Sequence, residues 1–273
     1  MKPVETGRRP GFPLRMPVAP NQASATKIIA GSARIMGATE LKDTKKQAIK
    51  PVLNAATGIG LDSQAVRDRM VSKLAAQGVQ DDRVLAAMRQ IERHRFVDSA
   101  LVNQAYEDTS LPIGLGQTIS KPNVVARMLA LLLQNRDGKL GRVLEIGTGC
   151  GYQAALLAQL ATEVYSIERL RGLHDRARDN LRPLRVANLH LLFGDGMVGY
   201  AKGAPYAAII AAAVGDALPQ AWIDQLAVGG RLVAPVQGAH GAQALVVVDK
   251  TALGITQTLL EAVHFVPLKS GTS

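Results

Sequence analysis

Three acidic residues have positions from which they could bind a nucleotide. Glu145 directly precedes a glycine-rich segment, Glu168 ends an apolar run, and Asp195 follows the next apolar run along the chain. Carboxylates at the ends of buried strands accept hydrogen bonds from the hydroxyl groups of a ribose. Any one of these acids alone could equally be a turn residue or a helix cap. Three acids behind one glycine-rich segment favour a cofactor site.

The glycine-rich segment contains Gly147, Gly149 and Gly151, each separated from the next by one residue. Because glycine has no Cβ, the backbone here can approach a ligand closely. A dinucleotide fingerprint would need a further glycine where this sequence has Tyr152. The segment also lacks the Gly-Lys-Ser/Thr of a phosphate-binding loop. The spacing therefore argues against both of these nucleotide-binding loops.

The elements that position these residues alternate between strand and helix from Gly141 onward. Continuous apolar runs are typical of strands buried on both faces, as in a parallel sheet covered by helices. We expect such strands at Arg142–Ile146, Glu163–Ile167, Leu189–Phe193, Ala207–Ala213 and Arg231–Val236, and helices near Tyr152–Leu160, Leu173–Leu181 and Gln220–Leu226. Two final runs, Gln243–Val248 and Gly254–Phe265, have no helix between them and predict an antiparallel pair.

The expected fold class is α/β, a Rossmann-like doubly wound and mostly parallel sheet with a small N-terminal helical subdomain. In such a sheet the ends of consecutive strands meet at one crevice, which would bring the acids together. We divide the chain into a basic, disordered extension (1–60), a helical subdomain with a substrate-side loop (61–140) and a cofactor-binding domain (141–273). Asp62 and Ser63 are of residue types that begin helices, and Asp81 and Asp82 open a second helix.

The net charge of +10 is concentrated in the first 60 residues, which carry +7 of it. This segment is rich in Pro, Gly, Ala, Thr and Lys, has Phe12 as its only aromatic residue, and predicts a solvated tail. A tail that binds nucleic acid or an anionic surface is the alternative, although it has no further aromatic residues to stack on bases. A basic organelle transit peptide also stays open.

Several classes of protein are excluded by composition. No apolar run approaches the roughly 18 residues that a membrane-spanning helix needs. Cys150 is the only cysteine, which rules out an internal disulfide framework and favours a reducing compartment, so we expect a cytoplasmic protein. No metal site is expected, because the five histidines show no metal-ligand spacing. Cys150 itself is expected to be a small packed residue.

The glycine-rich segment with its preceding acid resembles the first motif of class I S-adenosylmethionine-dependent methyltransferases. That resemblance implies S-adenosylmethionine as the methyl donor and S-adenosylhomocysteine as the product. It places Glu168 at the ribose and Asp195 near the adenine. The residues implied to bind the cofactor are Glu145, Gly147, Thr148, Gly149, Gly151, Glu168, Asp195 and Gly196.

Upstream motifs resemble more specifically those of the protein-L-isoaspartate O-methyltransferase family. The segment Leu111–Pro122, which contains Gly-Gln-Thr-Ile-Ser, is the strongest of these, and Phe265–Leu268 agrees near the end. The resemblance covers roughly residues 62 to 268. It implies methyl transfer to the α-carboxylate of isoaspartyl residues in damaged proteins and peptides. It implies no nucleic-acid or membrane partner, and we expect a monomer.

The same resemblance implies that Ser120, supported by Thr118, donates hydrogen bonds to the substrate carboxylate. That carboxylate is already ionised near neutral pH, so the reaction needs no strong general base. An alternative role for Ser120 is purely structural, because it lies just before Pro122, where a helix is expected to start, and serine is a favoured N-cap.

The sequence departs from the family at three places. Ala207 stands where an acid is usual, the run Ala211–Ala213 replaces a stretch that often includes a hydroxyl, and His264 stands where an arginine is common. A cofactor-binding protein without turnover stays an alternative because of Ala207 and the basic tail. A methyltransferase of the same fold acting on RNA or a small molecule is the other alternative, although the Asn-Pro-Pro-Tyr motif of base-modifying relatives is absent from the sequence.

Overall fold

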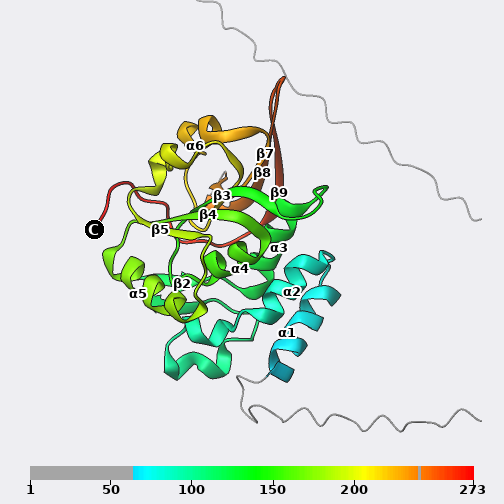
Figure 1. Ribbon diagram of the computed structural model, residues 1–273, viewed down its shortest axis with the longest axis vertical. Coiled ribbons are helices and arrows are strands. Elements are labelled where there is room, and N and C mark those ends of the chain that lie inside the picture. The colour runs from blue at the N-terminus through cyan, green and yellow to red at the C-terminus, as the bar shows by residue number, and fades with distance from the viewer. Residues whose placement is uncertain (1–63, 239–240) are drawn as a thin grey trace, which may run out of the picture. The chain divides into compact units, whose positions relative to one another are not determined.

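The structure is a computed structural model that describes residues 64–238 and 241–273. The expectations for the tail at 1–60 and for the helix start at Asp62 and Ser63 lie outside these residues. The described residues all belong to one compact unit, which contains the sheet and the helices before it (Figure 1). No helix among them is long and apolar enough to cross a membrane.

A seven-stranded sheet in the order β5-β4-β3-β6-β7-β8-β9 forms the centre of the unit (Figure 1). Its strands are β3 (Leu140–Ile146), β4 (Ala161–Glu168), β5 (Leu189–Phe193), β6 (Tyr206–Ala211), β7 (Leu226–Gln237), β8 (Gln243–Thr251) and β9 (Gly254–Ala262). The first five of these pair in parallel, whereas β7–β8 and β8–β9 are antiparallel. The expected fold class is confirmed, including the antiparallel pair that ends the sheet.

The sheet is buried because successive residues of each strand face two different cores. Val143 packs with helices α1 to α5 on one face, and its neighbour Leu144 packs with α6 on the other. The covering helices include α4 (Tyr152–Leu160), α5 (Arg171–Leu181) and α6 (Gln220–Gln225). Apolar residues are therefore needed at consecutive strand positions, which explains the continuous apolar runs in the sequence.

The segment before the sheet is helical and shares the larger of the two cores. It comprises α1 (Gln64–Ala76), α2 (Asp82–Gln90), the 3₁₀ turns η1 (Arg93–Phe96) and η2 (Ser99–Gln104), a hairpin of β1 (Leu111–Gly114) and β2 (Gln117–Ile119), and α3 (Pro122–Leu133). Met70 of α1, Met88 of α2 and Leu129 of α3 all lie in the core that contains Val143. The helices thus pack against both the hairpin and the sheet in one shared core.

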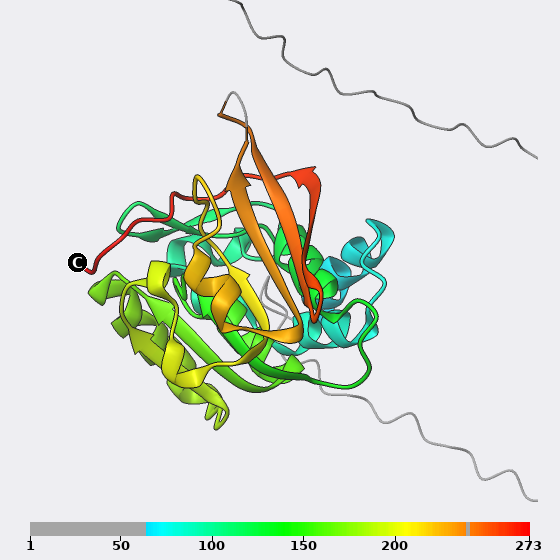
Figure 2. The same ribbon diagram turned by 90° about the horizontal axis from the view of Figure 1, so that it is seen from above.

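Strand boundaries differ from expectation mainly at β7, which begins at Leu226 instead of Arg231. Tyr206 pairs with Leu226 and Ala208 pairs with Arg231, so the register shifts between these two pairs. The extra residues of β7 at this shift include Gly229 and Gly230. At the other end, β9 stops at Ala262. The chain after β9 runs back across the carboxyl ends of the strands toward α5 (Figure 2).

Candidate active site

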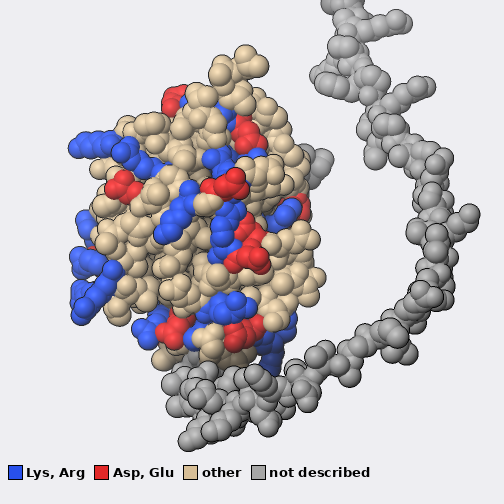
Figure 3. All heavy atoms as spheres, turned by 45° about the vertical axis from the view of Figure 1, so that its right-hand side comes forward, with Lys and Arg blue, Asp and Glu red and all other residues tan. Residues whose placement is uncertain are grey.

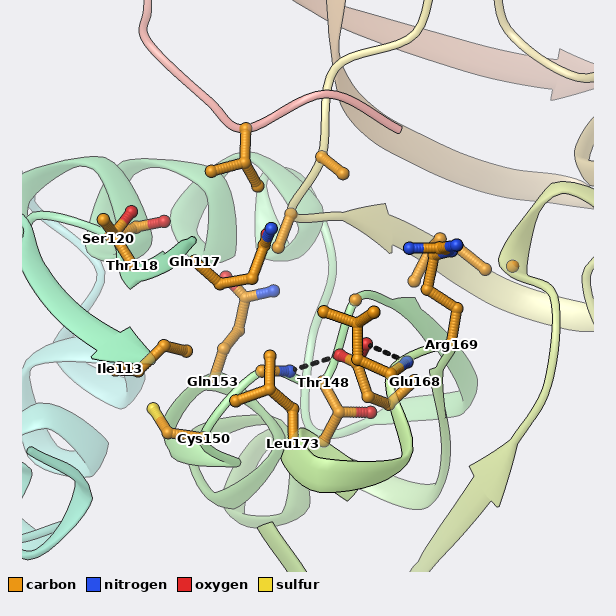
Figure 4. Close-up of a pocket in the computed structure, with 18 of the residues that line it drawn as sticks. Ile113, Gln117, Thr118, Ser120, Thr148, Cys150, Gln153, Glu168, Arg169 and Leu173 are labelled. Carbon is orange, nitrogen blue, oxygen red and sulfur yellow. Dashed lines mark hydrogen bonds between the residues drawn. The ribbon is translucent and has the colours of Figure 1, made fainter. Parts of the chain in front are cut away.

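A cavity of about 230 Å³ opens at the carboxyl ends of the parallel strands. Its walls come from the β1–β2 hairpin, the β3–α4 loop, the end of β4, the residues after β6 and the segment Val266–Lys269. In Figure 4, Ser120 and Thr118 lie on one side of the cavity, and Glu168 and Arg169 lie on the other. The tertiary structure therefore brings the two groups of candidate residues to one site.

The loop from β3 to α4 depends on glycine for its backbone conformation. Gly147, Gly149 and Gly151 have φ values of +88°, +57° and +92°, a region that other residues rarely adopt. Gly147 and Gly149 line the cavity, as does Thr148 between them. Gly151 lies behind it, where an added Cβ would approach Leu181 Cδ1 to 2.9 Å. Gly151 therefore acts through close packing of the loop against α5.

Glu168 lies on the cavity wall with both carboxylate oxygens fixed. Oε2 accepts a hydrogen bond from Gly149 N at 2.9 Å, and Oε1 accepts one from Leu170 N at 2.9 Å. A carboxylate has about four acceptor positions, so further hydrogen-bond donors can still be accepted. Glu168 thus both shapes the glycine loop and offers acceptors to a ligand.

Glu145 is fully buried behind the loop and does not line the cavity. Burial raises the pKa of its carboxyl to about 8, opposed mainly by the hydrogen bond that Ser166 Oγ donates to Oε2 at 2.5 Å. Gln153 lies close enough to oppose this rise slightly as well. Within residues 64–238 and 241–273, however, Glu145 Oε1 and Gln153 Nε2 make no hydrogen bond of standard geometry. The two side chains interact with each other behind the loop, and because both atoms are buried, neither is exposed to the cavity.

Asp195 has a different position from the other two acids. Its Oδ1 accepts from Met197 N at 2.8 Å, and so it caps the 3₁₀ turn η4 (Gly196–Val198). Its Oδ2 accepts from Gly271 N at 2.6 Å. Asp195 lines a second, shallower hollow beside Phe193 and Tyr200, while the adjacent Gly196 lines the main cavity. The structure thus brings Gly196 to the cavity wall but not Asp195.

Ser120 and Thr118 both line the main cavity, and their hydroxyl oxygens make no hydrogen bond to another described residue. The structural alternative for Ser120 is wrong, because the N-cap of α3 is Lys121 and no side chain caps that position. Instead, Asn123 N donates to Asp108 Oδ1 at 2.9 Å, so a distant carboxylate satisfies this helix end. The Ser120 hydroxyl remains available to a ligand.

Sequence reasoning missed several residues of the cavity wall. The segment Val266–Lys269 follows β9 and is held there by Leu268 N, which donates to Val214 O at 2.7 Å. Nothing in its local sequence indicates a position beside the glycine loop. Gln153 could have been found, because it falls in the first turn of the helix that the loop begins. Cys150 lines the cavity and is buried, and burial raises the pKa of its thiol, as suits a packed residue.

The described residues contain no group of three or more side chains arranged to hold a metal ion. The cavity instead combines backbone amides, one fixed carboxylate, two free hydroxyls and apolar walls. Such a lining suits an organic cofactor and a small polar acceptor group.

Comparisons with known proteins agree with this lining. The family model for protein-L-isoaspartate(D-aspartate) O-methyltransferase (PCMT) matches residues 65–273. A protein-L-isoaspartate O-methyltransferase of Methylibium petroleiphilum is 64% identical over 79% of this chain and 81% of the relative. One of Leptothrix cholodnii is 61% identical over 84% of this chain and 81% of the relative.

Solved structures show the same fold. One protein-L-isoaspartate O-methyltransferase matches with a TM-score of 0.68 and 27% identity, covering 75% of this chain and 66% of that chain. A Plasmodium falciparum structure described under the same name, in complex with S-adenosyl-L-homocysteine, matches with a TM-score of 0.64 and 24% identity, covering 74% of this chain and 98% of that chain. With a family model that spans the described unit and relatives above 60% identity, the chain belongs to the protein-L-isoaspartate O-methyltransferase family.

Proposed function

We propose that this chain transfers a methyl group from S-adenosylmethionine to the free α-carboxylate of isoaspartyl residues in damaged proteins, which starts their repair. One observation carries the proposal. A single cavity is lined on one side by the glycine loop and Glu168 and on the other by two free hydroxyls, Thr118 and Ser120. Donor and acceptor groups would therefore meet within one cavity.

The residues present fit the cofactor. Glu168 has acceptor positions left for ribose hydroxyls, and the glycine loop leaves room for close backbone approach. Gln153 adds a polar side chain to this wall, and Glu145 supports the loop from behind. When bound, the cofactor supplies an electrophilic methyl group on a sulfonium. Gly147, Thr148 and Gly196 would form the remaining contacts, while Gly151 and Asp195 would act by holding the loops that carry them.

Ser120 and Thr118 would bind the acceptor carboxylate. A hydroxyl donates one hydrogen bond, and two hydroxyls two residues apart at the end of β2 can hold and orient a carboxylate. No residue has to remove a proton, because the carboxylate is ionised at neutral pH. These side chains therefore contribute placement of the attacking oxygen.

The apolar walls would favour the reaction by excluding water. A cation and an anion cancel during methyl transfer, so the transition state carries less charge than the reactants. A dry cavity lined by residues such as Ile113, Leu173 and Leu268 favours the less charged state. The protein thus contributes orientation and desolvation instead of acid–base catalysis.

The remaining features of the protein belong to the same proposal. We place it in the cytoplasm as a monomer whose partners are isoaspartyl-containing proteins and peptides, with no nucleic-acid partner. Over the middle of the face in Figure 3, Lys and Arg lie among Asp and Glu. Mixed charge on this part of the face does not form the single-sign surface that nucleic acid requires. Functionally, residues 61–140 would carry the substrate loop, 141–273 the cofactor site, and 1–60 neither.

The experiment that tests the function uses paired peptides that differ only in one linkage. The full chain is incubated with labelled S-adenosylmethionine and either an aspartyl peptide or its isoaspartyl isomer. We expect label in the isoaspartyl peptide alone, and S-adenosylhomocysteine should bind the protein in calorimetry. Equal labelling of both peptides, or cofactor binding without labelling of either, would contradict the proposal; labelling of RNA instead would support the alternative methyltransferase.

A further inference from the structure

Arg93 is a buried arginine next to the site, and the proposed mechanism gives it no role. Its side chain is 0% exposed, although arginine is almost never fully buried without a charged partner. Burial lowers the pKa of the guanidinium, which nevertheless stays charged at neutral pH. Among the described residues no carboxylate forms a salt bridge with Arg93, although the charge of Asp108 acts on it from a distance, so its hydrogen bonds go to neutral groups.

Those neutral groups are backbone carbonyls from two separate segments. Arg93 Nε donates to Ala105 O at 2.8 Å, and Nη2 donates to Ser120 O at 2.8 Å. A longer contact of 3.5 Å joins Nη2 to Thr109 O. One rigid, planar group therefore ties the end of η2 to the residue that carries the proposed donor hydroxyl.

The same guanidinium also contacts the cofactor side of the site. Its Cζ lies 5.0 Å from the centre of the Tyr152 ring, and Tyr152 is the first residue of the helix that follows the glycine loop. Tyr152 lines the cavity as well. Arg93 therefore joins the substrate loop to the helix that begins at the cofactor loop, without reaching the cavity itself.

Stability alone does not account for this arrangement. Arg93 has no salt bridge to a described residue, and a buried charge without an ion-pair partner disfavours folding relative to an apolar side chain of similar volume. A long apolar side chain would fill the same space. What the arginine adds is directional contact with Ser120 O, next to a hydroxyl that no other described group orients.

We propose that Arg93 is a positioning residue for methyl transfer, which holds the backbone of Ser120 so that its hydroxyl faces the cavity. The inference rests on the proposed function, because it assigns Ser120 as the donor to the substrate carboxylate. A positioning role differs from a structural role in one respect, because the effect of Arg93 on turnover then requires the Ser120 hydroxyl. Misplacement of an orienting group by about 1 Å can lower a rate by about 100-fold, so a small shift is sufficient.

The test is a double-mutant cycle between Arg93→Lys and Ser120→Ala in the full chain. Lysine keeps the charge but cannot bond Ala105 O and Ser120 O in the same planar geometry. We expect R93K to lower kcat for the isoaspartyl peptide by roughly 10- to 100-fold. The dissociation constant for S-adenosylhomocysteine should change by less than about twofold. In the S120A background R93K should have almost no further effect, because the hydroxyl it positions is gone.

Arg83 provides the matched control at the other end of α3. Its Nη1 donates to Arg136 O and Gly138 O at 2.8 Å each, and Nη2 donates to Leu133 O at 3.2 Å, far from the cavity wall. R83K removes a similar set of arginine–carbonyl bonds, together with the two-bond contact of Arg83 with Asp81. It should lower the melting temperature and leave kcat within about twofold of the wild type at a temperature where it is folded.

Several outcomes would overturn the positioning role. Among them are unchanged kcat in R93K, losses that multiply in R93K/S120A, and an equal loss of kcat in R83K. If R93K does not bind S-adenosylhomocysteine, Arg93→Gln replaces it, since an amide still donates one hydrogen bond without a buried charge. If both variants are unfolded, the arginine is required for the fold and the positioning role is rejected. If the wild type is active and the losses of R93K and S120A multiply in the double variant, only this inference is contradicted. If the wild type does not methylate the isoaspartyl peptide, the proposed function is contradicted as well.

Discussion

At the scale of single residues, the chemistry of the site depends on which polar atoms are already satisfied. Asp195 is occupied by two backbone amides, and Glu168 by two others. Ser120 Oγ has no hydrogen bond to another described residue and faces the same cavity as Glu168. The two carboxylates are thus equally occupied, and what separates them is position, because Glu168 lines the main cavity and Asp195 does not.

Ser120→Ala separates catalysis from capping. We expect kcat to fall by about 100-fold, comparable to the loss of one oriented donor in other enzymes. The melting temperature should barely change, because Lys121 and not Ser120 is the N-cap of α3. Asp81→Ala is the control, since Asp81 caps α2 through the amides of Arg83 and Val84. It should cost about 1 kcal/mol of stability and leave turnover intact. The opposite pattern would show that the hydroxyl has only a structural role.

Glu145→Gln tests the buried carboxyl through the pH dependence of stability. The folded pKa of about 8 lies above the ordinary glutamate pKa of 4.5, so the folded state retains a proton that the unfolded state loses. Stability is thus fully present below about pH 4.5 and decreases as pH rises toward 8, with a limiting slope of about 1.4 kcal/mol per pH unit.

The glutamine variant should lose this dependence, because an amide does not titrate. Urea unfolding at pH 5, 6, 7 and 8 measures it, with Glu261→Gln on exposed β9 as the control. A wild type and an E145Q variant with parallel pH profiles would show that Glu145 ionises in the folded protein near its ordinary pKa.

At the scale of elements, the glycine loop and α5 fit together only because Gly151 has no side chain. Its φ of +92° and the 2.9 Å approach of an added Cβ to Leu181 Cδ1 constrain it in two ways. The loop must bend sharply at this point for α4 to begin against α5. The element boundary therefore depends on packing as well as on local conformation.

Gly151→Ala should lower the free energy of unfolding by more than the about 1 to 2 kcal/mol expected for the left-handed backbone alone. Gly78→Ala isolates that backbone contribution, because Gly78 has a φ of +99° and nothing within 4 Å of an added Cβ. The comparison is made by urea denaturation. Equal losses in the two variants would mean that Leu181 moves aside without cost.

At the scale of the whole molecule, the described unit starts at Gln64 and the family model matches from residue 65. The cavity, both cores and the seven-stranded sheet lie within residues 64–273. Most of the net charge, +7 of +10, lies in residues 1–60. The part of the chain that holds the candidate site is therefore close to neutral.

Deletion of residues 1–60 should leave kcat/KM for an isoaspartyl peptide within about twofold of the full chain, because the described cavity walls come from residues 113–269 and the family model matches only from residue 65. Measurement at low and high salt checks whether the tail contributes electrostatically. A large loss of activity in a truncated chain that still binds S-adenosylhomocysteine would place part of the substrate site in the tail.

Residue types and spacing were enough to predict the alternating strands and helices, because burial on both faces of a sheet requires continuous apolar runs. They also predicted the position of the glycine loop, because positive φ favours glycine, and the position of Glu168 at the end of a strand. The sequence also indicated Ser120 and Thr118 through the resemblance of their segment to a known family. Only the tertiary structure decided that Lys121 caps α3, that Asp195 is occupied by Met197 and Gly271, and that Val266–Lys269 closes the cavity. Each of these depends on contacts between residues distant in the chain, or on which of several groups makes a given hydrogen bond. Neither can be predicted from local residue patterns.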